Sequence, residues 1–291
     1  MIGAGEMSGD SRCPSGFVYF PTARFMMGSR NGDRDEWPVR EIEVSAFCFA
    51  EHEATNTEYS TYVAKQAQQP AFNLMSVSCG AHAKSIVARE DSERQLHLQS
   101  RQIPDDPNRC NFVIEPKKVP TKLEKWNGYD GPNQPAVGVR WDQARAYCQS
   151  IGGDLATEAQ WERAARDVFK GCAPGHEYPT ASGKLNHSEA QYDAETTADV
   201  CTHGRTSLGL CDMAGNASEW VLDTYDGNWY GEMPEKDPVN LREGAKKVIR
   251  GGSSNPYFDD YLRAASRYSG SPGGFQTDVI GIRCVVAPSK P

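Results

Sequence analysis

The sequence contains no long run of apolar residues, and this excludes one class of protein. None of the 291 residues lies in an apolar stretch of about eighteen residues, the length that a membrane-spanning helix requires. The first residues, MIGAGEMSGDSRCPSG, lack the basic and apolar regions of a signal peptide. We therefore expect no membrane span, and we interpret residues 1–12 as a flexible leader.

Positive charge is also scarce. The chain has 31 Lys and Arg against 39 Asp and Glu, which gives a net charge of −8 at pH 7. Proteins that bind nucleic acid need a basic surface to neutralise phosphates, so we expect no nucleic-acid partner. This excess of acidic residues favours solubility, and cation binding is the alternative interpretation.

The usual catalytic and metal-binding motifs are missing. The sequence has no GxSxG elbow, no P-loop, no GxGxxG, no CxxC pair and no Cys/His cluster with zinc spacing. Asp259 and Asp260 are adjacent carboxylates, but neighbours on an extended chain point to opposite faces. We therefore expect neither a hydrolytic nucleophile nor a structural zinc site, and the two aspartates are not expected to act as an acid/base pair.

Cysteine, in contrast, is plentiful. Nine cysteines are dispersed through polar stretches, which favours disulfides and an oxidising compartment; buried thiols in a cytosolic protein are the alternative. An odd number leaves at least one cysteine free or paired between chains. Cys201 and Cys211 bracket the turn-rich loop THGRTSLGL and are the pair that we favour. The predicted location is periplasmic or secreted.

Local patterns predict a mixed α+β fold with long loops. Apolar periodicity indicates strands at 17–28 (two, around a turn), 39–49, 246–251 and 281–286, and helices at 56–67, 141–151 and 155–169. Thr157 and Gln160 form a capping box, which marks the last helix most clearly. The charged run 89–101 indicates a solvated face or a short exposed helix. Residues 70–135 lack periodicity and are interpreted as a loop-rich insertion.

Seven blocks in order resemble one family. They are FMMGS (25–29), EATNTEYSTYV (53–63), VRWDQARAYC (139–148), LATEAQWERAAR (155–166), GLCDMAGNASEW (209–220), RGGSSN…LRAASR (250–267) and GIRCV (281–285). Their order and spacing are similar to the sulfatase-modifying-factor family, which has the formylglycine-generating-enzyme fold. The resemblance implies a single irregular α+β domain over residues 13–287, related to C-type lectins, with a tail at 288–291.

The resemblance also identifies what this chain lacks. Formylglycine-generating enzymes oxidise a peptidyl cysteine with two cysteines that hold copper, and soft thiolates suit Cu(I). Alignment on Gly251, Gly252 and Ser253 places Pro256 and Tyr261 at those positions. The iron-binding HxxxHxE pattern of related sulfoxide synthases is also absent. We therefore expect no copper, no iron and no formylglycine-generating activity; a divergent metal-dependent oxidoreductase or peptide-modifying enzyme is the alternative.

Calcium is the cofactor that the residues favour. Carboxylates and backbone carbonyls on an irregular loop are the oxygen ligands that calcium uses, and the matching family positions bind a structural calcium. The predicted first site comprises Asp212, Gly215, Ala217 and Glu219, and a second family site resembles Asn186, His187 and Asp199. Helix or turn capping is the alternative role of Asp212 and Glu219.

The segment around residue 255 predicts a binding surface. Tyr and Phe supply rigid contact area, and Ser, Asn and Asp supply adaptable hydrogen bonds; in C-type-lectin-like folds this C-terminal face binds ligands. The predicted ligand-binding residues are Ser254, Asn255, Tyr257, Phe258, Asp259, Asp260, Tyr261, Tyr268 and Ser269, and the ligand is a protein, peptide or glycan. Arg263 and Arg267 are interpreted as ion-paired scaffold. The pattern also resembles retroelement-diversified variable proteins, although ordinary family members have similar loops.

Overall fold

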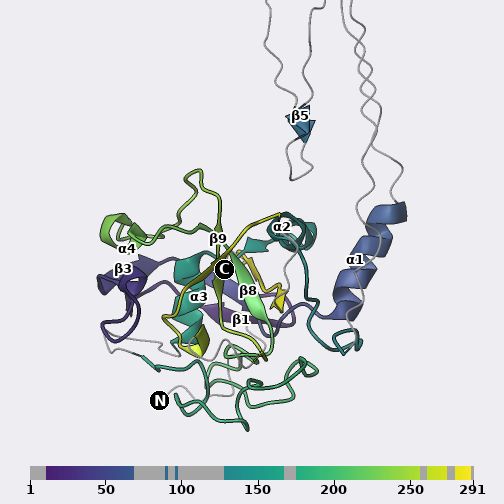
Figure 1. Ribbon diagram of the computed structural model, residues 1–291, viewed down its shortest axis with the longest axis horizontal. Coiled ribbons are helices and arrows are strands. Elements are labelled where there is room, and N and C mark those ends of the chain that lie inside the picture. Colours follow the sequence, from purple (N-terminus) through teal and green to yellow (C-terminus); the bar gives the residue numbers. More distant parts are fainter. Residues whose placement is uncertain are drawn as a thin grey trace, which may run out of the picture. The chain divides into compact units, whose positions relative to one another are not determined.

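The computed structural model describes residues 11–68, 89–90, 96–97, 128–166, 175–255, 261–273 and 279–289. The chain divides into two compact units, one formed by residues 1–60 with 123–291 and the other by residues 61–122. The first unit contains both four-stranded sheets and the β2-β3 pair, which Figure 1 shows together with α2, α3 and α4.

One four-stranded sheet unites segments that are far apart in the sequence. Its order is β1-β4-β12-β7, and all its described pairings are antiparallel. The strands are β1 (Phe17–Phe20), β4 (Phe47–Ala50), β12 (Cys284–Val286) and β7 (Asp154–Leu155). The first and last strands of the unit therefore belong to the same sheet.

A second four-stranded sheet carries the C-terminal segment. Its order is β10-β9-β8-β11, with β11 parallel to β8 and the other pairs antiparallel. The strands are β8 (Ser218–Thr224), β9 (Lys247–Arg250), β10 (Tyr268–Gly270) and β11 (Ile280–Gly281). The stretch between β9 and β10 contains the segment that the sequence marks as a binding surface.

The predicted strand at 39–49 is two strands in different sheets. β3 (Arg40–Val44) pairs with β2 (Ala23–Met27), whereas β4 joins β1. The chain breaks between them because Ser45 donates from N and Oγ to the Asp237 carboxylate, at 2.6 and 2.7 Å. The two strands predicted at 17–28 are confirmed as β1 and β2, but each pairs with a different partner.

The three predicted helices are confirmed, except that the last begins at Glu158 and not at residue 155, because Leu155 belongs to β7. The three longer helices are α1 (Asn56–Gln68), α2 (Trp141–Ser150) and α3 (Glu158–Ala165). The chain also forms a short α4 (Trp229–Glu232) and a 3₁₀ turn, η1 (Arg34–Glu36). Thr157 Oγ1 accepts from Gln160 N at 3.1 Å, and Gln160 Oε1 accepts from Thr157 N at 2.9 Å. The predicted capping box is therefore confirmed.

In the second unit, β5 (Arg89–Glu90) and β6 (Leu96–His97) pair antiparallel. These four residues belong to the charged run 89–101. The helical interpretation of that run is therefore wrong at the residues that the structure describes, because cross-strand pairing replaces the helical turn.

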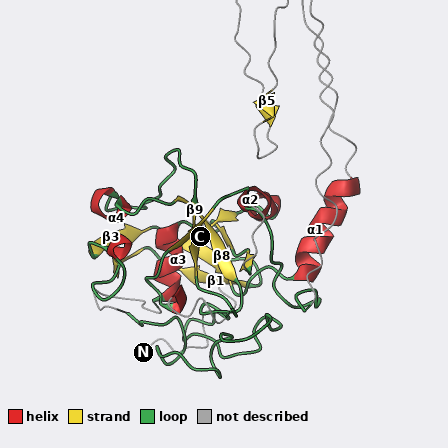
Figure 2. Cartoon of the chain, viewed as in Figure 1, coloured by secondary structure: helices red, strands yellow, loops and turns green. Residues whose placement is uncertain are grey.

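The core of the first unit lies where α3 packs against β2, β8 and β9. Trp161 is fully buried there, and the rings of Phe20 and Phe47 stack with centroids 4.8 Å apart. Figure 2 shows few helices, short strands and much loop. The expected α+β class is confirmed. No described helix has the length and apolar character needed to cross a bilayer.

Disulfides tie these elements together. Cys13 bonds to Cys48, Cys148 to Cys284, and Cys201 to Cys211. The Cys148–Cys284 bond joins α2 to β12, and the Cys201–Cys211 bond closes the loop expected from its turn-rich sequence. The prediction of disulfides is confirmed, and every cysteine in the described part of the chain is paired.

Candidate functional site

Ion pairs with buried glutamates involve the arginines of the segment 250–267 and Arg166. We call them the arginine scaffold; it consists of Arg166, Arg250, Arg263 and Arg267 with Glu36, Glu158 and Glu162. Arg267 donates from Nε and Nη2 to the two carboxylate oxygens of Glu158, at 2.7 and 3.0 Å. Such two-point pairs fix orientation as well as charge. The prediction that Arg263 and Arg267 are ion-paired scaffold is confirmed.

Glu162 is the centre of this scaffold. Its carboxylate accepts from Arg166 at 2.8 Å, from Arg250 and from the Tyr230 hydroxyl at 3.1 Å. Burial alone would raise the pKa of Glu162, but Arg166 and Arg250 outweigh that effect and lower its pKa. The pKa of Glu162 therefore favours its charged form, which is paired with two arginines.

The two ends of the predicted binding segment meet at Gly252 and Leu262. Gly252 has φ +66°, and a Cβ there would lie 2.7 Å from Leu262 Cδ2. Only glycine combines that backbone conformation with so close an approach. Leu262 is fully buried. The segment between these residues therefore has a closed base.

The predicted ligand-binding residues have different environments. Ser254 is fully buried: its N donates to Asn216 O at 2.9 Å, and its carbonyl accepts from Ala194 N at 2.8 Å. Four others are half-buried: Asn255, Tyr261, Tyr268 and Ser269. Tyr257, Phe258, Asp259 and Asp260 lie outside the described residues.

The Tyr261 and Tyr268 rings pack against each other, with centroids 5.0 Å apart. The cavity that they line with Gly252 and Ser253 measures about 10 Å³, which is room for one water molecule at most. The described part of this face therefore has no ligand-sized cavity around the tyrosine pair. A ligand there would have to bind on the surface.

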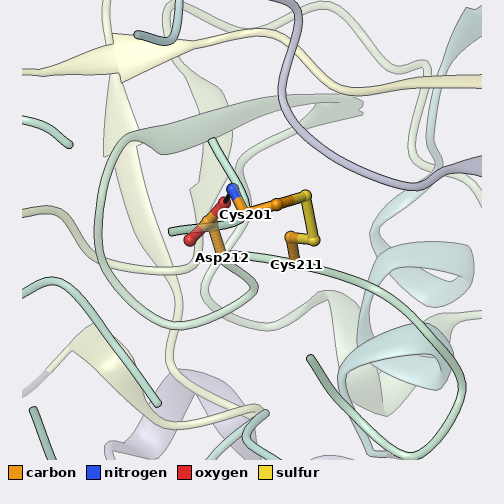
Figure 3. A group of neighbouring side chains, drawn as sticks. All are labelled: Cys201, Cys211 and Asp212. Atoms are coloured by element: carbon orange, nitrogen blue, oxygen red, sulfur yellow. Dashed lines mark hydrogen bonds between the residues drawn. A yellow bond between two sulfur atoms is a disulfide. The ribbon is translucent and has the colours of Figure 1, made fainter. Parts of the chain in front are cut away.

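The loop that carries the predicted calcium ligands is strained and held by a disulfide. Cys201, Asp212 and Asn216 have φ of 61°, 53° and 57°, which non-glycine residues rarely adopt and which tends to cluster at functional positions. Figure 3 shows the Cys201–Cys211 disulfide beside Asp212, whose Oδ2 accepts from Cys201 N at 2.6 Å. The two sulfur atoms and a carboxylate oxygen lie within 4.8 Å of one another. The bonded sulfurs are not free thiolate ligands, so Asp212 alone offers a ligand atom here.

Asp212 belongs to a group of three buried carboxylates. We call it the carboxylate cluster: Glu53, Asp212 and Glu219. Glu219 accepts from Arg283 Nε at 2.7 Å and from Trp161 Nε1. Glu53 accepts from Ala217 N at 3.1 Å. One buried arginine therefore faces three buried carboxylates.

The pKa values of the cluster reflect this imbalance. Burial, followed by the nearby Asp212 charge, raises the pKa of Glu53 well above its ordinary value. Burial also raises the pKa values of Asp212 and Glu219, against the opposing effect of Arg283. Protonation or an added cation would each offset this excess of buried negative charge.

The residues of the predicted first calcium site fit that ion by charge and by ligand type. Asp212 Oδ1 is buried without a hydrogen-bond partner. Both Glu219 oxygens already accept one N–H, but each carboxylate oxygen has a second lone pair. Gly215 has φ +81°, and a Cβ there would lie 2.1 Å from Gln191 O, so the loop requires glycine. Ala217 follows in the same buried loop.

Glu53 is the member of the carboxylate cluster that sequence reasoning missed. It lies in the block 53–63, which carries the family resemblance, but its neighbours give no local sign of a buried acid. Its contact with Ala217 spans 164 residues. The signal that could have identified Glu53 is its position as an acid within a family block, like Asp212.

The second predicted calcium set is less closely associated. Asn186 Oδ1 accepts from Ser188 Oγ at 2.6 Å. The His187 carbonyl is 3.0 Å from His203 Nδ1, and the Asp199 carbonyl accepts from Thr202 Oγ1 at 2.6 Å. Within the described ranges, no hydrogen bond joins Asn186, His187 and Asp199 to one another. Their role as ligands stays a prediction.

Comparisons with known proteins agree with the resemblance. A family model described as the sulfatase-modifying factor enzyme 1-like domain matches residues 4–288. Serine/threonine-protein kinase Pkn1 of Chlamydia trachomatis is 29% identical over 269 residues, which cover 92% of this chain and 37% of the kinase. The formylglycine-generating enzyme of Streptomyces coelicolor is 28% identical, covering 94% of this chain and 90% of the enzyme. The chain thus spans 37% of the length of the chlamydial relative.

Other relatives and structures extend this result. The inactive C-alpha-formylglycine-generating enzyme 2 of Mus musculus is 26% identical, covering 94% of this chain and 86% of that protein. The structure of PvdO from Pseudomonas aeruginosa has a TM-score of 0.60 at 20% identity and covers 95% of each chain. Treponema denticola variable protein 1 has a TM-score of 0.60 at 19% identity, covering 94% of this chain and 95% of that one. The expected fold is confirmed.

Proposed function

The chain belongs to the sulfatase-modifying factor enzyme 1-like family, and from this premise we propose that it is a ligand-binding module without formylglycine-generating activity. Its ligand is a protein, peptide or glycan at the C-terminal face. Calcium stabilises the module, and its location is extracytoplasmic. The same fold hosts many functions, so the residues of the site decide which of them a chain can perform.

The state of the cysteines carries this proposal. All six cysteines in the described ranges are bonded in disulfides. The sequence has Pro256 and Tyr261 where the family keeps its copper-binding thiols, and neither side chain replaces a thiolate. Tyr261 instead packs its ring against Tyr268. An aromatic pair on a surface is suited to contact area rather than to copper chemistry.

The relatives support binding without catalysis on this fold. One mammalian relative is named as an inactive formylglycine-generating enzyme, and one structural neighbour is named as a variable protein. Half-buried Asn255, Tyr261, Tyr268 and Ser269 provide aromatic and hydrogen-bonding groups at the C-terminal face. The arginine scaffold holds both ends of the segment that presents them. Diversification of this segment by a retroelement is part of the same proposal.

Calcium binding is supported by the carboxylate cluster. The side chains of Asp212 and Glu219, with the carbonyls of Gly215 and Ala217, would hold the ion. Asp212 Oδ1 is buried without a partner, and the cluster carries more negative charge than Arg283 neutralises. A bound divalent cation would offset that excess and brace the loop. Three disulfides support the extracytoplasmic location, because such bonds persist in oxidising compartments.

The test combines metal analysis with an activity assay. Purified protein is analysed for calcium, copper and iron, and is then incubated with cysteine-containing peptides, Cu(I) and oxygen. Mass spectrometry of a hydrazide adduct detects peptidyl aldehyde, and the Streptomyces coelicolor enzyme is the positive control. We expect stoichiometric calcium, no copper or iron, and no aldehyde. Copper or iron together with aldehyde would overturn the proposal in favour of a divergent peptide-modifying enzyme.

A further inference from the structure

A second cavity, of about 480 Å³, lies beside the arginine scaffold. Its size is within the range typical of small-molecule sites. The loop after β2, from Gly28 to Asn31, forms one part of its lining, and Arg166 and Arg263 form another. It shares no lining residue with the cavity beside Tyr261. A ligand of this cavity would therefore contact residues other than those around the cavity beside Tyr261.

Two of the arginines in the lining are fixed in place. Arg263 donates from Nη2 and Nη1 to the buried Glu36 carboxylate, at 2.6 and 3.1 Å. Arg166 donates from Nη2 to Gly28 O at 2.6 Å and to Glu162 at 2.8 Å. Their charges are offset by these buried acids, so they give the cavity rigid polar walls rather than free positive charge.

Two other charged side chains in the lining have opposite sign, and neither is paired within the described part of the chain. Arg30 and Glu177 are exposed, and neither side chain makes an ion pair or hydrogen bond with the described residues. Glu177 is nevertheless positioned by its backbone, since its carbonyl accepts from Ala264 N at 2.8 Å. Met26, Val39 and Ala265 supply apolar surface in the same lining. Among its described lining residues, the cavity thus offers a cationic side chain, an anionic side chain and an apolar wall.

We propose that this cavity binds a small zwitterion, of the class of free amino acids and short peptides. The ligand's carboxylate pairs with the Arg30 guanidinium, whose planar fork matches a carboxylate. Its ammonium pairs with the Glu177 carboxylate, and its side chains contact Met26 and Val39. A polyanion fits less well, because Glu177 repels it and the charges of Arg166 and Arg263 are already neutralised.

Dialanine with both ends free is the probe. Its N-acetylated form lacks the ammonium, and its C-terminal amide lacks the carboxylate. Binding to the full chain is followed by NMR titration to millimolar peptide, at fixed calcium. We expect free dialanine to bind at least about tenfold more tightly than either blocked form, which corresponds to about 1.4 kcal/mol.

Two substitutions separate the two ends of the ligand. Arg30→Ala is expected to abolish the preference for dialanine over its amide, and Glu177→Gln the preference over the acetylated form. Both residues are exposed, so the melting temperature should not change. Arg34→Ala, an exposed arginine of η1 outside the cavity lining, and Glu243→Gln, another exposed acid, are the matched controls.

The outcomes are distinct. Equal binding of the three peptides, no binding of any of them, or unchanged preferences in both variants would overturn the zwitterion site. Tyr261→Ala alters the predicted binding face but not this cavity, so it should leave dialanine binding unchanged. Failure of this inference therefore leaves the proposed function intact, and the reverse also holds.

Discussion

The carboxylates of the arginine scaffold and of the carboxylate cluster are all buried, but the two regions differ in charge balance. In the scaffold, four arginines accompany three glutamates, whereas in the cluster Arg283 alone accompanies three carboxylates. Neighbouring residues of α3 connect to each: Glu162 pairs with Arg250, and Trp161 donates to Glu219. The two regions are therefore adjacent in the chain but electrostatically distinct.

The difference appears in the direction of the pKa shifts. The pKa of Glu162 is lowered because Arg166 and Arg250 outweigh burial, while the pKa of Glu53 is raised because burial and Asp212 outweigh Arg283. Burial alone thus does not decide whether a carboxyl group is charged; the number of counter-ions does. In the scaffold each glutamate has an arginine partner, whereas in the cluster three carboxylates share Arg283, and a proton or a cation would offset their excess charge.

Removing one arginine from the scaffold would leave a buried carboxylate with too few counter-ions, as in the cluster. Arg267→Ala leaves Glu158 buried without its two-point partner. The free energy of unfolding is expected to fall by about 3–5 kcal/mol, the usual cost of an uncompensated buried charge. Urea denaturation with intact disulfides measures this, and adding Glu158→Gln should recover part of the loss.

The control for this prediction is an exposed ion pair. Arg242 donates to Glu232 at 2.7 Å, and both side chains are 56% exposed. Arg242→Ala should cost less than about 1 kcal/mol, because solvent screens such pairs. A comparable loss in both variants would mean that the scaffold is no more important than a surface pair.

Calcium removal should affect the cluster and not the scaffold. An ion that binds only the folded state stabilises it by about 2.7 kcal/mol at a hundred times its dissociation constant. A chelator is therefore expected to lower the melting temperature of the native chain. Asp212→Asn should abolish the shift, since it keeps an oxygen for Cys201 N but removes the charge. Arg267→Ala should retain it. An unchanged melting temperature in the native chain would refute calcium binding.

The smallest expected effect is the pH dependence of the free energy of unfolding. The folded-state pKa of Glu53 is raised, so the folded chain retains a proton that the unfolded chain has released above pH 4.5. Without calcium, stability should therefore fall as the pH rises from about 4.5, by up to about 1.4 kcal/mol per pH unit for one proton. Denaturation between about pH 5 and 7 in a chelator measures this slope.

Glu53→Gln should make that slope shallower but not flat. Asp223, whose pKa burial and Glu158 raise to about 7, contributes in the same direction from pH 3.8 up to about 7 and remains in the variant. Saturating calcium should also reduce the slope, because the ion favours the deprotonated cluster. A steeper slope in the variant would contradict the assignment of a raised pKa to Glu53.

Elements with local signals could be predicted from the sequence. The Thr157–Gln160 capping box marks the start of α3, since its hydrogen bonds span three residues. The Cys201–Cys211 pair brackets one short loop and spans 10 residues. Arg263 and Arg267 could be assigned to the scaffold from the family blocks. Each of these depends on residues that are close in the sequence or that belong to the same family block.

Features that depend on distant residues could not be predicted. The break between β3 and β4 requires Asp237, 192 residues from Ser45, and the Cys148–Cys284 bond spans 136 residues. Glu53 reaches the Asp212 loop only through the fold. The 480 Å³ cavity combines the loop after β2 with Arg263, which no local pattern places together. Residues 256–260 lie outside the described ranges, so the roles of Tyr257 to Asp260 stay predictions.

The contact between Gly252 and Leu262 has a consequence for evolution. Because the base of the segment is closed by these residues and anchored by Arg250 and Arg263, its middle can vary in sequence and length at little energetic cost. Doubling the length of a flexible loop with fixed ends costs only about 0.6 kcal/mol. Insertions between Asn255 and Tyr261 are therefore expected to cost little stability, whereas the buried positions Gly252, Ser254 and Leu262 are expected to resist substitution.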